Sequence, residues 1–146
     1  MTDDPTSEQY HSDFHAWALH QAAMLRAGLV LQADIMNIAE ELEDMAGSKQ
    51  DQLTNRLGVL LAHLLRWHYQ PARRGRSWLA TISEQRRRID RLLRQNPSLK
   101  HKLPETFADA SGDARLIAIR ETDLPDETFP AGCPWSFDQA IMDDPT

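Results

Sequence analysis

From Ile35 to Trp67 the apolar side chains recur with the 3.6-residue period of an α-helix. The stripe consists of Ile35, Ile38, Leu42, Met45, Leu53, Leu57, Leu60, Leu64 and Trp67. A helix that keeps this phase from a cap at Asp34 to Gln70 would be about 55 Å long at 1.5 Å per residue. Pro71 ends it, because proline has no backbone N–H to donate.

The weak point of this helix is the segment from Gly47 to Gln52, where the stripe becomes polar. Ser48 followed by Asp51 resembles a capping box, so two helices joined by a break or kink are the alternative. We expect one continuous or gently kinked helix, because the register survives the polar segment.

The sequence before this stripe predicts one helix after a flexible start at residues 1–11. Ser12 is a plausible N-cap, and Gly28 is a suitable end. The side chains that share one face of this helix are Phe14, Trp17, Ala18, Gln21 and Leu25.

A third helix is predicted to begin at a Ser77 cap and to end at Asn96 and Pro97. Its inner face consists of Trp78, Ile82, Gln85, Ile89 and Leu92 or Leu93, and its outer face of Arg87, Arg88, Arg91 and Arg94. Glu84 with Arg88 and Asp90 with Arg94 have the i,i+4 spacing of stabilising ion pairs.

The remainder of the chain predicts a turn, a fourth helix and an irregular tail. Pro104 suits the first position of the fourth helix, whose inward residues are Phe107, Ala110, Ala114 and Ile117. Prolines make residues 122–134 irregular, and a capping box of Ser136 and Gln139 precedes a short helix over residues 137–142. We therefore expect residues 1–146 to form a single all-α domain, a bundle of about four main helices.

Charge is divided into three blocks along the chain. Residues 66–102 carry eleven Lys or Arg against two acids, whereas residues 1–65 hold three bases and ten acids and residues 103–146 hold two bases and ten acids. The basic block is either neutralised by the acidic flanks or kept exposed for an anionic partner. The net charge of −6 argues against general nucleic-acid binding, although an average conceals a local basic surface.

The basic block supplies the candidate binding site for an anion or an acidic partner. Arginine outnumbers lysine nine to two there, which favours bidentate contacts to carboxylate or phosphate. Gly75 and the first N–H groups of the following helix could cradle an anion. The arginines of this candidate site are Arg73, Arg74 and Arg76 in the turn and Arg87, Arg91 and Arg94 on the third helix.

Four aromatic residues are candidates for structural packing or for contact with a partner: Trp17, Trp67, Tyr69 and Trp78. The last three flank the basic turn, where they could stack on guanidinium groups or on nucleic-acid bases.

The sequence contains no recognisable catalytic constellation. Glu40 and Asp44 share a helix face, and we expect an arginine such as Arg56 to neutralise them rather than catalysis to use them. Ser77 lacks the third residue and the oxyanion turn of a nucleophilic triad, and a hydrogen-bonded core position explains His63. We therefore expect a protein that is not an enzyme.

The six histidines do not form a convincing metal site. Glu8 with His11 and His11 with His15 have ligand spacing, but a di-metal bundle needs a second Glu-x-x-His pair. We expect neither a metal nor another cofactor.

Three features that the sequence lacks bear on the cellular compartment of the protein. The first nine residues have no apolar signal region, no apolar run reaches the roughly 20 residues of a spanning helix, and Cys133 has no partner for an intramolecular disulfide. We expect a cytoplasmic protein without membrane association.

Several motifs together resemble the bacterial domain-of-unknown-function 29 family, nearly from end to end. They lie at residues 13–17, 37–45, 60–71, 77–78, 81–82, 85–86, 97–99, 124–125, 129–130 and 133–134. The resemblance implies a small helical protein of a family without an assigned activity. The chain departs from the family pattern at His11, His15, His20 and His68.

The function expected first is that of a non-enzymatic, self-associating interaction protein with an Arg-rich hairpin and a Trp-rich helix face. Its partner is a second copy or another acidic protein. The alternative is a nucleic-acid-associated factor that binds the phosphate backbone through the third helix. One observation distinguishes the two hypotheses. Arginines paired with acids of other helices favour the self-associating protein, and an open strip of arginines favours the nucleic-acid-associated factor.

Overall fold

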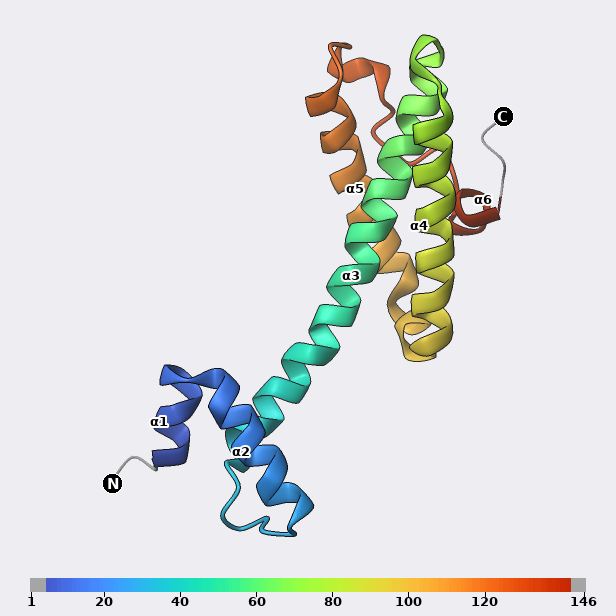
Figure 1. Cartoon of the computed structure of the whole chain (residues 1–146). Helices are drawn as coiled ribbons and strands as arrows, with labels where there is room; N and C mark the ends of the chain where they lie inside the picture. The colour runs from blue at the N-terminus through green and yellow to red at the C-terminus, as the bar shows by residue number, and fades with distance from the viewer. Residues whose placement is uncertain (1–4, 143–146) are drawn as a thin grey trace. The chain divides into compact units, whose positions relative to one another are not determined.

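The computed structural model describes residues 5–142 and confirms the all-α fold, since no strand occurs in this range (Figure 1). No helix there has the length and apolar character needed to cross a membrane. The α-helices are α1 (Pro5–Ser12), α2 (Phe14–Arg26), α3 (Ile35–Tyr69), α4 (Arg76–Gln95), α5 (Leu103–Glu121) and α6 (Phe137–Met142). Short 3₁₀ turns are η1 (Pro71–Arg73), η2 (Pro97–Lys102) and η3 (Asp126–Thr128).

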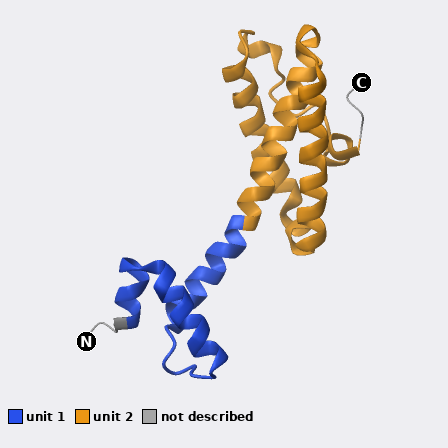
Figure 2. Ribbon diagram, in the orientation of Figure 1, with its two compact units in different colours: residues 1–48 blue, residues 49–146 orange. Residues whose placement is uncertain are grey.

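The chain divides into two compact units, residues 1–48 and 49–146, which Figure 2 shows in blue and orange. Unit 1 contains α1, α2 and the beginning of α3. Unit 2 contains the remainder of α3 together with α4, α5 and α6.

Unit 1 is held together by a polar cluster around a buried tryptophan. Trp17 is 3% exposed, and its Nε1 donates to Asp34 Oδ2 at 3.1 Å. The backbone N–H of Asp34 donates to Oε1 of buried Gln21 at 2.7 Å. Asp34, predicted only as a cap, therefore links the loop before α3 to two positions of α2.

The beginning of unit 1 differs from the prediction. Of residues 1–11, expected to be flexible, residues 1–4 lie outside the described range, and residues 5–11 belong to helix α1, in which Tyr10 contacts the rings of Phe14 and Trp17. Ser12 is the last residue of α1, so the cap of α2 is Asp13, whose Oδ1 accepts from Ala16 N at 3.1 Å. The end near Gly28 is confirmed: α2 stops at Arg26, and Gly28 has a φ of +76°.

Helix α3 is continuous over 35 residues, which confirms the preferred prediction over the break at Gly47. Its apolar stripe is buried only in unit 2. Leu53, Leu57 and Leu60 are 0% exposed, whereas Leu42 and Met45 in unit 1 are 60% and 63% exposed. Periodicity predicted the helix and its face, but not how much of that face is covered.

The core of unit 2 is built from α3, α4 and α5. Ala110, Ala114 and Ala118 form a small-residue seam on α5 that is fully buried. A Cβ on Gly58 of α3 would lie 3.9 Å from the Ala110 carbonyl oxygen, so the two helices approach closely there. Phe107 and Ile117, also predicted to face inward, are partly buried against the same core.

Helix α4 buries Ile82, Ile89, Leu92 and Leu93, as its pattern predicts. The Ser77 cap was wrong, because α4 begins at Arg76 after an N-cap at Gly75 and no side chain caps it. Gly75 supplies the first backbone acceptor instead, and its oxygen accepts from Leu79 N at 3.2 Å.

The C-terminal segment follows the predicted course. Apart from η3, residues 122–134 have no helix, and α6 spans the predicted residues. Its capping box is formed reciprocally: Ser136 N donates to Gln139 Oε1 at 3.0 Å, and Gln139 N donates to Ser136 Oγ at 3.2 Å. Arg86 Nε of α4 donates to the Ala140 carbonyl at 2.9 Å and holds α6 in place.

Candidate anion-binding groove

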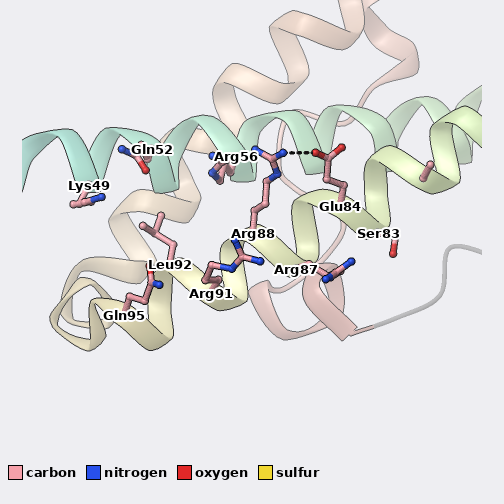
Figure 3. Close-up of a pocket in the computed structure, with 11 residues that line it drawn as sticks. Lys49, Gln52, Arg56, Ser83, Glu84, Arg87, Arg88, Arg91, Leu92 and Gln95 are labelled. Atoms are coloured by element: carbon pink, nitrogen blue, oxygen red, sulfur yellow. Dashed lines mark ion pairs between the residues drawn. The ribbon is translucent and has the colours of Figure 1, made fainter.

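A groove of about 660 Å³ lies between α3 and α4 in unit 2 (Figure 3). Five of its lining residues carry a positive charge and one carries a negative charge. The cations are Lys49 and Arg56 from α3 and Arg87, Arg88 and Arg91 from α4; the acid is Glu84. The other lining residues are Gln52, Ala80, Ser83, Leu92 and Gln95.

Helical spacing brings these cations to the groove from two separate parts of the sequence. On α3, Lys49, Gln52 and Arg56 are three and four residues apart and so share one face. On α4, Arg87 and Arg91 are one turn apart. Because Leu53 and Ile89 are buried in the common core, the polar faces beside them border the same groove.

Two arginines of α4 are paired with acids of the same helix. Arg88 Nη2 lies 2.6 Å from Glu84 Oε1, the contact marked in Figure 3, and Arg94 Nε lies 2.9 Å from Asp90 Oδ2. Both pairs were predicted, and both lie within α4. In the part of the chain that the structure describes, neither Arg87 nor Arg91 forms an ion pair, so no acidic helix of the same chain neutralises these two arginines. Pairing with the acids of a second copy stays a prediction.

The six arginines predicted as one site are divided by the structure. Arg87 and Arg91 line the groove, whereas Arg94 is 73% exposed outside it and paired with Asp90. Arg73 and Arg76 are exposed near the turn. Arg74 folds back on the end of α3, where its Nε donates to the Trp67 carbonyl at 2.7 Å.

Lys49 and Arg56 were missed as site residues. Their signal was present in the sequence as a polar stripe at helical spacing beside the apolar stripe of α3. Arg56 was instead assigned to neutralise Glu40 and Asp44, and neither acid forms an ion pair among residues 5–142.

The four candidate aromatic residues are packing residues. Trp17 and Trp67 are buried, at 3% and 6% exposure, so these two rings are not exposed for a partner. Tyr69 is half-buried with its ring centroid 5.6 Å from that of Phe129, and Trp78 is half-buried beneath Arg66. None of the four lines the groove.

The remaining candidates have local structural partners. His63 Nδ1 lies 2.9 Å from the Val59 carbonyl oxygen of the preceding turn. Glu41 accepts a 2.5 Å hydrogen bond from the Tyr10 hydroxyl, which raises the pKa of Tyr10 to about 12. Within residues 5–142, no three His, Cys, Asp or Glu side chains are placed to hold a metal ion.

Fold and groove together define an all-α protein with a basic groove between two helices of one unit. The chain belongs to the family described as domain of unknown function DUF29, whose model matches residues 9–145. Comparisons with curated proteins and with solved structures gave no significant match.

Proposed function

We propose that the chain is a non-enzymatic, nucleic-acid-associated protein that binds the phosphate backbone through the groove between α3 and α4. One observation carries the proposal: five cations border this groove and only one acid accompanies them. Like charges gathered on a folded surface raise the local positive potential and attract a multivalent anion.

The side chains of the groove favour phosphate. Four of the five cations are arginines, whose planar forks form bidentate contacts to phosphate oxygens. Arg87 and Arg91 form no ion pair within the described residues, so a ligand need not displace an existing partner. This is the open strip that distinguishes the nucleic-acid alternative from internal neutralisation.

The groove also limits the mode of binding. No aromatic side chain lines it, so bases have no platform on which to stack. Contacts would be made to the backbone and would carry little sequence information. The net charge of −6 opposes association, so we expect an affinity in the non-specific range, with Kd about 10⁻⁴ to 10⁻⁶ M at physiological salt.

The test is fluorescence anisotropy of a labelled DNA duplex over a series of salt concentrations. Each phosphate neutralised contributes about −0.9 to the slope of log K against log salt, so four or five contacts predict a slope of about −4. The double variant Arg87→Gln/Arg91→Gln should bind more weakly and with a slope smaller by about 2.

The matched control is Arg73→Gln/Arg76→Gln, which removes the same charge from the basic turn outside the groove. It should keep the wild-type slope. No binding at the lowest salt concentration would overturn the proposal. Equal losses in the two double variants would overturn the assignment of binding to the groove.

A further inference from the structure

We infer that the acidic unit 1 of a second copy of this chain docks in the same groove, so that the protein associates head to tail and masks its own phosphate site. The inference rests on the groove of the proposed function, but not on its nucleic-acid ligand. It assigns a partner surface and a form of regulation to unit 1.

Unit 1 carries a strong excess of negative charge. Residues 1–48 contain nine acids and one base, Arg26, whereas residues 49–146 contain thirteen acids and fifteen bases. The ion pairs of the described residues all lie in unit 2. The two units of one chain thus present opposite charges, and both leave charged side chains without ion-pair partners.

The acids of unit 1 are concentrated on the beginning of α3. Glu40, Glu43 and Asp44 are exposed, and Glu40 and Asp44 lie one turn apart on the same face. Like charges at this spacing destabilise a helix. A cationic surface that approached this face would remove the repulsion.

The spacing of these acids matches the spacing of the bases in the groove. Glu40 and Asp44 are four residues apart, as are Arg87 and Arg91, and four residues of α-helix rise about 6 Å. When two helices pack side by side, each acid of such a pair can therefore meet one arginine. Charge-assisted Arg–carboxylate contacts of this kind are about twice as strong as neutral hydrogen bonds.

A contact between two different surfaces of identical chains is heterologous, so it closes into a ring or grows into a longer assembly. Unit 1 also exposes large apolar side chains, among them Leu31 at 98% and Met36 at 82%. Association through that apolar surface would bring two acidic units together and would strengthen with salt. The head-to-tail contact weakens with salt, because screening reduces the attraction between opposite charges.

The test is light scattering of the full chain over ranges of protein and salt concentration. At low salt the wild-type mass should rise above the single-chain 16.7 kDa as the concentration increases, and it should return to 16.7 kDa at high salt. The triple variant Glu40→Gln/Glu43→Gln/Asp44→Asn and the groove variant Arg87→Gln/Arg91→Gln should both remain at the single-chain mass.

The matched control, Asp109→Asn/Asp123→Asn/Glu127→Gln, removes the same charge from exposed positions of unit 2 and should associate as the wild type does. A single-chain mass for the wild type at low salt would overturn the inference. Association that persists in the acidic-face variant, or that strengthens with salt, would overturn it as well.

Binding of the DNA duplex to the acidic-face variant separates this inference from the proposed function. If the variant stays single-chain and binds DNA more tightly than the unit 2 control, masking by unit 1 is supported. Salt-sensitive association without DNA binding in any variant would overturn the proposed function and the masking, and would leave the head-to-tail contact between unit 1 and the groove standing. If the wild type binds DNA but keeps the single-chain mass, the proposed function stands and the head-to-tail inference is overturned.

Discussion

The guanidinium carbon of Arg66 lies 4.5 Å from the centroid of the Trp78 ring. Arg66 Nη1 also lies 2.9 Å from Glu121 Oε2, and the Arg66 side chain is only 18% exposed. One arginine of α3 therefore contacts α4 through an indole and α5 through a carboxylate. It joins α3, α4 and α5 near the basic turn.

Arg66→Lys should lower the free energy of unfolding by about 1 kcal/mol, because lysine retains the charge but loses the planar stacking on Trp78. Glu121→Gln, which removes the partly exposed ion pairs of Glu121 with Arg66 and Arg120, should cost less than about 1 kcal/mol. Urea unfolding followed by circular dichroism measures both values. A larger loss for Glu121→Gln than for Arg66→Lys would show that the ion pair, not the stacking, is the main contribution.

Thr106 is a second buried residue that links helices, and it is 1% exposed. Its hydroxyl donates to the Lys102 carbonyl at 2.9 Å and accepts from the side-chain amide of Gln50. Thr106→Val should cost about 1–3 kcal/mol, because it leaves the Gln50 amide without its partner. Thr54→Val, which removes only a bond to the carbonyl of the preceding turn, should change stability by about 0.5 kcal/mol or less. Equal costs in urea unfolding would contradict this account.

Tyr10 should give unit 1 a dependence on alkaline pH. The hydrogen bond to Glu41 is the largest cause of its raised pKa, which is about 12 against an ordinary value of 10.0. Because the folded pKa is the higher one, the stabilisation is fully present below pH 10 and is lost as pH rises towards 12.

An ultraviolet titration of tyrosinate, compared between the wild type and Tyr10→Phe, isolates this group. The difference between the two curves should show one proton lost near pH 12, and the thermal midpoint of the wild type should fall more steeply between pH 10 and 12 than that of the variant. A difference curve centred at pH 10 would show that Glu41 does not hold the Tyr10 proton.

Two glycines should respond to alanine with opposite signs. Gly47 lies inside continuous α3, and a Cβ added there would meet no atom within 4 Å, so Gly47→Ala should add about 0.5–1 kcal/mol to stability. Gly28 has a φ of +76°, so Gly28→Ala should cost about 1–2 kcal/mol. Thermal unfolding measures both. A loss of stability in Gly47→Ala would contradict the view that α3 gains from a stiffer backbone at this position.

Local chemistry explains what the sequence could predict of the fold. The 3.6-residue stripe predicted α3 through its polar segment, Pro97 marked the end of α4, and Ser136 with Gln139 marked the start of α6. Each of these signals acts over only a few residues. The wrong caps at Ser12 and Ser77 were placed one or two positions from the observed ones, where Asp13 and Gly75 competed for the same role.

Only two of the five cations that line the groove were predicted as site residues. Arg87 and Arg91 were recognised because they are close together in the sequence and lie opposite the buried face of α4. Lys49 and Arg56 lie near Arg87 and Arg91 only because α3 packs on α4. That packing brings together residues that are far apart in the sequence, so no local pattern predicted it. For the same reason Glu40 and Asp44 were assigned to Arg56, although among residues 5–142 neither acid forms an ion pair with it.

The alanine seam of α5 and the charged border of the groove should tolerate substitution to different degrees. Ala110 is fully buried, and a Cβ on Gly58 would already lie in van der Waals contact with its carbonyl oxygen at 3.9 Å, so a side chain much larger than alanine at either position would overpack this line of contact. The charged side chains bordering the groove are under no such steric constraint. Substitutions among these charged side chains should therefore change what the groove binds without disturbing the contact between α3 and α5.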